Sequence, residues 1–309
     1  MKILELFAGI GACSTALKRL GLDIEIVDAV EIDKYAIASF NAIHNTNFEI
    51  QDITQWDKNI KDIDLITHGS PCQDFSVAGK QAGGDIGSGT RSSLMYETIR
   101  IVGQVRPKYV LWENVKNILS QKHKHNFDAY IDIMNVLGYN SYYQVLNAKD
   151  YGIPQNRERV FTVSIRKDID EGDFIFPEKE ELNLRLKDIL EDEVDEKYFI
   201  LARDWKDPKC IKLPGAYGRD FGSKGKLQEE ICDTLQAAMG SGGGNVPIID
   251  ITRIRKLTPK ECWRLMGFSD MDFEKAQSVP MSNTQLYKQA GNSIVVNILE
   301  KVFKKLFKE

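Results

Sequence analysis

The chain has 309 residues, of which 42% are hydrophobic and 28% charged, and its formal net charge is −4. These proportions are ordinary for a globular protein, and they exclude intrinsic disorder and collagen-like repeats. Its apolar runs are shorter than the roughly 18 residues of a membrane span, and the sequence enters a predicted strand directly, without a charged leader. We therefore expect a cytosolic protein with one large or two smaller domains.

Strand-like and helical patterns alternate over the first 165 residues. Apolar or β-branched runs predict strands at 3–7, 24–30, 65–67, 109–112, 142–146 and 160–165. Helical periodicity between several of them predicts helices at 13–20, 34–44, 93–105 and 127–138. This alternation is typical of a doubly wound α/β sheet, which binds ligands where its strands end.

The pattern dissolves after about residue 186, and we predict three parts from it. They are a catalytic and cofactor-binding domain (1–186), a smaller, irregular, β-rich domain (187–286), and a C-terminal helix that returns to the first domain (287–309). Helical patterns recur at 258–268 and 292–307. Basic residues outnumber acidic ones between residues 201 and 264, which fits a confined nucleic-acid contact as well as a solvated basic surface.

Polar residues follow three predicted strands near the amino terminus. Gly9 and Gly11 lie between a strand and a helix, where they permit a tight turn and close approach to a ligand. Glu31 ends the second strand 22 residues after Gly9, near the offset at which an acidic side chain binds ribose hydroxyls. Asp52 belongs to IQDIT (50–54), where we expect a third strand to end. Together these positions suggest an adenosine-containing cofactor, although each taken singly also fits a plain strand end.

The segment HGSPCQDFS (68–76) places a cysteine behind a proline, just after a buried strand. A thiol is a good nucleophile when its surroundings favour the thiolate, and Pro71 would fix the turn that presents Cys72. The next strand ends in LWENV, which brings Glu113 to the same edge of the sheet. A carboxyl group in an apolar setting can share a proton near neutral pH, so the pair fits addition to an electron-poor ring.

The cysteines and histidines do not indicate a metal site. The five cysteines are widely spaced and include no CxxC pair, and the four histidines form no ligand cluster. We therefore expect reduced thiols and no metal, which also excludes a zinc-dependent cytidine deaminase.

With these motifs in order over almost the whole chain, the sequence resembles the cytosine-5 DNA methyltransferase family. The matching segments are FAGIG (7–11), Glu31, Asp52, the proline–cysteine–glutamine motif (71–73), ENV (113–115), QNRER (155–159), RKLTPKE (255–261) and YKQAGNSI (287–294). The resemblance implies that Cys72 attacks carbon 6 of a flipped-out cytosine while Glu113 acts at ring nitrogen 3. It also implies roles for Arg157 and Arg159 near that base, for Asn114 in orienting the turn, and for residues 73–91 as a closing lid.

The family further implies S-adenosylmethionine as the cofactor, with S-adenosylhomocysteine as its product. Matching by motif assigns the cofactor pocket to Phe7, Gly9, Ile10, Gly11, Glu31, Asp52, Pro71, Asn292 and Ser293. The partner implied is duplex DNA, recognised by residues 187–254, and its expected contacts are Gln73, Ser76, Gln155, Thr234 and Arg255. We expect a monomer that meets no membrane, with a cognate restriction endonuclease as a candidate partner.

Two positions depart from the family pattern, and three other classes of protein share some of its features. Ser70 replaces a common phenylalanine and Ala12 a common glycine, which leaves less apolar surface against the cofactor but removes no chemical step. A transfer-RNA methyltransferase would use the same Cys72 and Glu113, although the glycine-rich stretch at 239–245 favours DNA. A non-catalytic DNA-binding relative should have lost these residues, and a nicotinamide dehydrogenase would leave Cys72 unexplained.

Overall fold

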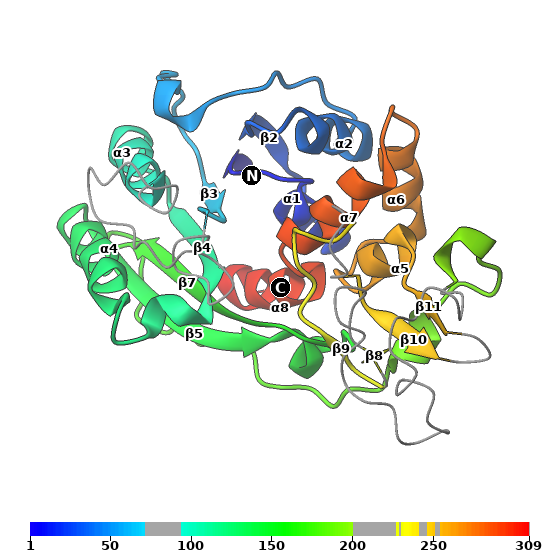
Figure 1. The fold of residues 1–309 in the computed structure, drawn as a ribbon. Helices are drawn as coiled ribbons and strands as arrows, with labels where there is room; N and C mark the ends of the chain where they lie inside the picture. Colours follow the sequence, from blue (N-terminus) through cyan, green and yellow to red (C-terminus); the bar gives the residue numbers. More distant parts are fainter. Residues whose placement is uncertain (72–93, 200–226, 229, 241–245, 251–253, 309) are drawn as a thin grey trace. The chain divides into compact units, whose positions relative to one another are not determined.

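The structure is a computed structural model that describes residues 1–71, 94–199, 227–228, 230–240, 246–250 and 254–308 (Figure 1). These residues form two compact units, each built from separate stretches of the chain. The first unit comprises Met1–Asn147, Glu158–Glu178 and Ile298–Glu309, and the second comprises Ala148–Arg157 and Lys179–Asn297. The functional division into 1–186, 187–286 and 287–309 stays a prediction.

The first unit is built on a six-stranded sheet. Its strands are β1 (Lys2–Leu6), β2 (Glu25–Val30), β3 (Leu65–His68), β4 (Tyr109–Val115), β5 (Tyr139–Asn147) and β7 (Glu158–Arg166), in the order β2-β1-β3-β4-β7-β5. The pairs among β1 to β4 are parallel, whereas β7 runs antiparallel to both β4 and β5. The predicted α/β fold is therefore confirmed.

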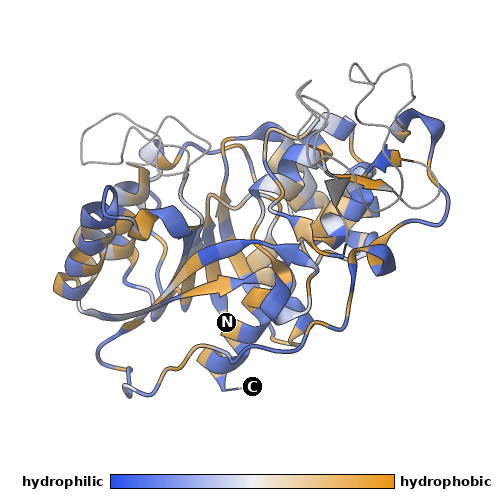
Figure 2. Cartoon of the chain, turned by 60° about the horizontal axis from the view of Figure 1, so that its bottom comes forward, coloured by the Kyte–Doolittle hydropathy of each residue, from blue (hydrophilic) through white to orange (hydrophobic). Residues whose placement is uncertain are grey.

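Helices cover both faces of this sheet (Figure 1). One face packs against α3 (Met95–Val105) and α4 (Lys124–Val136), through a core in which Ile66 and Trp112 meet Val102 and Phe127. The other face packs against α1 (Ala12–Arg19), α2 (Lys34–His44) and the part of α8 (Val296–Phe307) that belongs to this unit. The parallel strands β1, β3 and β4 are almost wholly buried, as expected for parallel strands covered on both faces, and apolar residues (orange in Figure 2) occur throughout the sheet.

One strand expected from the sequence is absent from this sheet. Residues 50–52 are not a strand, and Asp52 instead caps a short 3-10 helix, η1 (Ile53–Gln55), by accepting a hydrogen bond from the Thr54 N–H at 2.9 Å. An aspartate readily bonds to the backbone two residues ahead, and this local turn replaces the strand. The Gln51 N–H still donates to the Glu31 carbonyl at 2.9 Å, which keeps this segment beside the end of β2.

The second unit combines short strands with helices. The strands β8 (Leu227–Gln228), β10 (Ile248–Asp250) and β11 (Ile254–Lys256) form one sheet, and β6 (Gln155–Asn156) pairs with β9 (Cys232–Asp233). The helices are α5 (Pro259–Arg264), α6 (Asp270–Gln277) and α7 (Asn283–Asn292), and the first two begin with capping boxes. Short 3-10 turns complete the chain as η3 (Lys116–Leu119), η4 (Ala148–Tyr151), η5 (Leu186–Ile189) and η6 (Glu196–Tyr198).

One predicted helix ends earlier than expected, and another begins later. The helix expected at 258–268 ends at Arg264, because Gly267 has a φ of +82° and terminates the helical turn. The helix expected at 292–307 begins only at Val296, since Ser293 is extended and caps the preceding α7. Among the described residues, no helix is both long and apolar enough to cross a lipid bilayer.

Candidate active site

The turn between β1 and α1 has the backbone geometry of a ligand-binding loop. Phe7, Gly9 and Gly11 all have positive φ, of 53°, 56° and 80°. The Gly9 N–H donates to Glu31 Oε2 at 2.9 Å, which ties the turn to the end of β2. A Cβ added to Gly9 would meet no atom within 4 Å, so open space lies above this glycine. Ile10 is buried and supports the turn from below.

Glu31 directly follows β2, an outermost strand of the sheet. Its second carboxylate oxygen accepts from the Asp33 N–H at 2.8 Å, and Asp33 in turn caps α2. Burial raises the pKa of Glu31 above its ordinary value, although these backbone donors oppose the shift. The next residue, Ile32, is 68% exposed, and the sequence reasoning missed it. An apolar residue directly after the carboxylate predicted to bind the ribose was the signal that could have drawn attention to it.

Asp52 is exposed beside this turn. Its Oδ1 accepts from both the backbone N–H and the hydroxyl of Thr54, at 2.9 Å each. These bonds fix the carboxylate in one orientation at the start of η1. Phe7, Gly9 and Glu31 are thus brought together with the segment that carries Asp52, as the sequence predicted for a cofactor pocket.

The chain after β3 leads toward the predicted nucleophile. Pro71 is the last described residue before a gap, so Cys72, Gln73, Ser76 and the predicted lid at 73–91 lie outside the described residues. Ser70, one of the two departures from the family pattern, is buried and accepts a hydrogen bond from Trp112 Nε1 at 3.1 Å. Ser70 is therefore a buried hydrogen-bonding residue in this protein.

Glu113 forms an ion pair at the end of β4. Its Oε1 lies 3.0 Å from Arg159 Nε, and both side chains are largely buried, with exposures of 12% and 15%. The register of β4 and β7 brings them together, because Val115 faces Arg159 across the antiparallel pair. The neighbouring Asn114 is buried, and its amide donates to the Ser70 carbonyl at 3.5 Å. The sequence predicted all three residues for one catalytic edge.

A hollow of about 410 Å³ lies directly after this strand, lined by Lys116, Asn117, Leu119 and Ser120. These residues form η3, which follows Glu113 and Asn114 in the chain. Lys116 is held there by an exposed ion pair with Glu158 at 3.0 Å. The first unit therefore offers open space next to the end of β4.

In the second unit, two residues of the QNRER segment are buried and bonded to backbone. Gln155 donates to the Leu265 carbonyl at 2.8 Å and accepts from the Leu235 N–H at 3.1 Å. Arg157 donates to the carbonyls of Leu235, Gly291 and Ser293 at 3.0, 3.2 and 2.8 Å. These bonds hold the segment after β9 against the end of α7. They favour positioning roles, while a contact of Gln155 with DNA and of Arg157 with the base stay predictions.

The same unit holds three other predicted residues. Thr234 donates its hydroxyl proton to the Asn156 carbonyl at 2.7 Å. At the end of α7, Asn292 is exposed and Ser293 is buried. Their assignment to the cofactor, like that of Thr234 to DNA, stays a prediction.

Arg255 is buried in an ion pair. Its two terminal nitrogens lie 2.8 and 2.6 Å from the carboxylate oxygens of Glu261, which is itself fully buried. Glu261 also accepts from the backbone N–H groups of Thr258 and Glu191. Such a bidentate pair favours a structural role for Arg255, and its expected contact with DNA stays a prediction.

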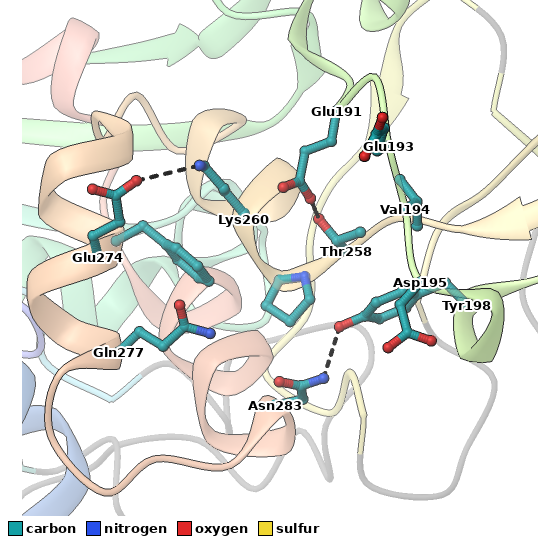
Figure 3. Close-up of a pocket in the computed structure, with 12 residues that line it drawn as sticks. Glu191, Glu193, Val194, Asp195, Tyr198, Thr258, Lys260, Glu274, Gln277 and Asn283 are labelled. Carbon is teal, nitrogen blue, oxygen red and sulfur yellow. Dashed lines mark hydrogen bonds and ion pairs between the residues drawn. The ribbon is translucent and has the colours of Figure 1, made fainter.

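Figure 3 shows a pocket of about 280 Å³ within the second unit. Glu191 bonds to Thr258 there, Lys260 lies 3.5 Å from Glu274, and Asn283 donates to Tyr198. Four carboxylates and a single lysine line it, and none of the residues predicted for chemistry does. Its acidic lining would repel phosphate, so this pocket is a poor site for nucleic acid.

The described part of the chain contains no group of three or more histidine, cysteine, aspartate or glutamate side chains that could hold a metal ion. Its cysteines Cys13, Cys232 and Cys262 are buried thiols.

The fold and the arrangement at the carboxyl edge define a class of methyltransferase, and comparisons identify the family. The model of C-5 cytosine-specific DNA methylases matches residues 1–308, and the chain belongs to this family. It is thus an enzyme of the DNA (cytosine-5-)-methyltransferase class.

Methyltransferases of bacteria and phages align with almost the whole chain. The type II methyltransferase M2.ScrFI of Lactococcus lactis subsp. cremoris is 36% identical over 100% of this chain and 99% of its own. The type II methyltransferase M.HhaI of Haemophilus parahaemolyticus is 35% identical over 97% and 92%. An orphan methyltransferase of Bacillus phage SPbeta, M.SPBetaI, is 30% identical over 99% and 97%.

Solved structures share the fold at lower identity. The S. pombe Dnmt2 methyltransferase matches with a TM-score of 0.73 and 20% identity, over 100% of this chain and 98% of that one. The Entamoeba histolytica methyltransferase EhMeth matches with a TM-score of 0.77 and 17% identity over the same shares. At these identities the likeness concerns the fold alone.

Proposed function

We propose that this enzyme methylates carbon 5 of a cytosine in a short sequence of duplex DNA, using S-adenosylmethionine, through a covalent bond between Cys72 and carbon 6. The observation that carries the proposal is the Glu113–Arg159 pair at the carboxyl edge of the sheet. It lies on β4, the neighbour of β3, and the segment after β3 leads within four residues from His68 to Cys72. The match to type II methyltransferases over the whole chain supports DNA as the polymer.

The turn after β1 fits the proposed cofactor. The open space above Gly9 would admit the methionine part beside the Gly9–Glu31 contact, with Phe7, Ile10, Gly11 and Pro71 as its neighbours. The Glu31 carboxylate would accept from the ribose hydroxyls, and the exposed Ile32 would provide an apolar surface for the adenine. Asp52 would accept from the adenine amino group, and Asn292 and Ser293 would complete the pocket. When bound, the cofactor supplies an electrophilic methyl group on a positively charged sulfur, which carbon 5 takes up.

The residues at the strand ends would carry the chemistry on the base. The Cys72 thiolate attacks carbon 6, and the electron pair of the 5,6 double bond moves toward carbon 5 and the ring. Glu113 holds or donates a proton at nitrogen 3, so that negative charge does not accumulate there. Arg159 keeps the Glu113 carboxyl oriented and contributes positive charge beside the base. After carbon 5 is methylated, loss of its proton returns an electron pair that expels Cys72 and restores the double bond.

The base must leave the duplex for this reaction, because carbon 6 is inaccessible in a stacked pair. Gln73 and Ser76 would contact the DNA around the flipped cytosine, and Thr234 would act in the recognition of the sequence. The buried positions of Gln155, Arg157 and Arg255 argue that these residues hold the recognition elements in place. A monomer that accompanies a restriction endonuclease is consistent with the type II relatives, whereas the orphan relatives of phages argue for an enzyme that acts alone.

The test is methyl transfer with a labelled cofactor. The protein and its Cys72→Ser variant are incubated with methyl-labelled S-adenosylmethionine and either duplex DNA or transfer RNA, and the labelled base is identified. We expect 5-methylcytosine in DNA with the wild type and none with the variant. Label confined to transfer RNA would overturn the assignment of the polymer, and label retained by Cys72→Ser would overturn the role of the cysteine.

A further inference from the structure

A hydrogen-bonded aromatic cluster lies beneath the segment that leads to Cys72. His68 ends β3 and faces Trp112 on β4, and their rings stack with centroids 5.7 Å apart and an interplanar angle of 4°. The Tyr130 ring of α4 packs against the Trp112 ring with centroids 4.1 Å apart. The Tyr130 hydroxyl lies 3.1 Å from His68 Nε2. All three side chains are at most 2% exposed. The Trp112 ring is therefore fixed from two sides.

This fixed ring directs its single donor at Ser70. Trp112 Nε1 donates to Ser70 Oγ at 3.1 Å, and Ser70 is only 3% exposed. A buried indole N–H needs an acceptor, so this bond constrains both partners. A phenylalanine at position 70 would provide no acceptor, and the Trp112 N–H would lose this partner.

Ser70 is also bound through its backbone. The pairing of β3 with β4 ends at His68 and Trp112. Past this point, side chains of β4 bond to the chain that follows β3. Asn114 Nδ2 donates to the Ser70 carbonyl at 3.5 Å, while Asn114 Oδ1 accepts from the Val115 N–H at 2.8 Å. Two residues of β4, on either side of Glu113, thus hold both the side chain and the carbonyl of Ser70.

We propose that the hydrogen bond between Trp112 and Ser70 positions the nucleophile relative to Glu113. Ser70 stands two residues before Cys72, and the strand that binds it is the strand that carries Glu113. Ser70, in place of the family's phenylalanine, thereby provides the acceptor for the Trp112 N–H. Ser70 and Trp112 are positioning residues, which act through the chain they hold. The inference rests on the proposed role of Cys72.

The test measures how fast the covalent bond forms. In the presence of the cofactor, duplex DNA that contains 5-fluorocytosine traps the enzyme, because carbon 5 then has no proton to lose after methylation. The variants are Ser70→Ala, Trp112→Phe and the double variant, and cofactor affinity and thermal unfolding are measured for each. Each single variant should form the adduct at least roughly tenfold more slowly, since a small misplacement of reacting groups has large effects on rate. Cofactor affinity should stay within about twofold of wild type, because both side chains are buried and bond to each other.

Two comparisons separate positioning from general loss of stability. The double variant should be no slower than the slower single variant, because both singles break the same bond. Tyr139→Phe is the matched control, since it removes a buried hydrogen bond to the Pro107 carbonyl at the opposite end of the sheet. It should form the adduct at the wild-type rate.

Four results would overturn the inference. Single variants that react at the wild-type rate would show that the bond has no role in positioning. An equal slowing in Tyr139→Phe, or slowing in the single variants that multiplies in the double variant, would assign the effect to stability. A wild-type protein that forms no adduct would remove the proposed function itself, and the inference with it.

Discussion

The Glu113 carboxylate forms an ion pair with Arg159 at a distance of 3.0 Å. Replacing Glu113 with glutamine keeps its shape but removes the group that holds or donates a proton at the base. We expect kcat to fall by about 10² to 10⁴, the usual range for a lost general acid or base. Steady-state methylation of DNA and direct binding of the cofactor would measure the two effects separately.

A matched control is Asp64→Asn, which changes a carboxylate paired with Lys108 at 2.7 Å at the other end of the sheet. It should retain kcat within about twofold, as expected for a partly exposed ion pair far from the carboxyl edge. A comparable loss in both variants would contradict the assigned role of Glu113.

Glu5 is a second carboxyl group with an unusual environment. It is buried on β1 and accepts from the N–H and the hydroxyl of Ser14, and burial raises its pKa to about 7. The folded protein therefore holds a proton that the unfolded chain releases above pH 4.5. The contribution of Glu5 to stability is full below pH 4.5 and is lost as the pH rises toward 7, by on the order of 3 kcal/mol.

The variant Glu5→Gln tests this dependence, because an amide can still accept from Ser14 but does not titrate. The free energy of unfolding of both proteins is measured in denaturant at pH 5 and pH 8. The free energy of unfolding of the variant should increase relative to that of the wild type as the pH rises. A difference between the two proteins that is independent of pH would contradict the prediction.

At this scale the sequence predicted positions on the sheet better than exposure. Glu113 lies near the end of β4 and Glu31 directly after β2, as the strand pattern predicts, because the carboxyl edge of a parallel sheet is a property of the topology. Arg159 lies near the start of the antiparallel strand β7, so its place beside Glu113 depends on a register that the pattern does not show. Arg255 reads as a DNA contact, yet it is paired with Glu261 six residues later. A basic residue in a linear pattern does not reveal whether a buried carboxylate neutralises it in the fold.

The turn between β1 and α1 depends on a close contact between elements. Gly11 has a φ of +80°, and a Cβ at this position would lie 2.1 Å from His44 Nε2 and 2.9 Å from Phe40 Cδ2 on α2. Gly11→Ala therefore combines left-handed strain with overpacking and should lower the free energy of unfolding by about 3 kcal/mol. Chemical denaturation would measure this loss.

Gly21→Ala is the control for strain alone, because Gly21 has a φ of +76° and a Cβ there would meet nothing within 4 Å. It should cost only about 1 kcal/mol. Equal losses in the two variants would mean that the contact with α2 has no part in the effect.

Periodicity explains which elements the sequence predicts. The buried strands and the helices of the first unit have strong apolar patterns, and their positions are confirmed within a few residues. The helix α6 was missed because only Phe273 and Ala276 are buried along it, and α7 because it is rich in polar residues. The expected strand at 50–54 failed because Asp52 and Thr54 form a local turn that competes with strand pairing.

For the whole molecule, charge makes a prediction about salt. The chain carries a net charge of −4 with an excess of basic residues between positions 201 and 264. We expect DNA binding to weaken steeply with salt, and a contact with about six phosphates would lose on the order of 10³ in affinity between 50 and 200 mM. Titration of labelled duplex at several salt concentrations measures the slope, and cofactor affinity should change little. Equal salt dependence for DNA and cofactor would contradict a confined phosphate contact.

The most direct test of the whole account is to identify the atom that bonds to DNA. The protein is incubated with the cofactor and duplex DNA containing 5-fluorocytosine, digested, and the cross-linked peptide is sequenced by mass spectrometry. We predict that the nucleotide is attached to the sulfur of Cys72, with a methyl group added to the base. Attachment to Cys13, Cys210, Cys232 or Cys262, or methylated DNA without any covalent bond to the protein, would contradict the proposed mechanism.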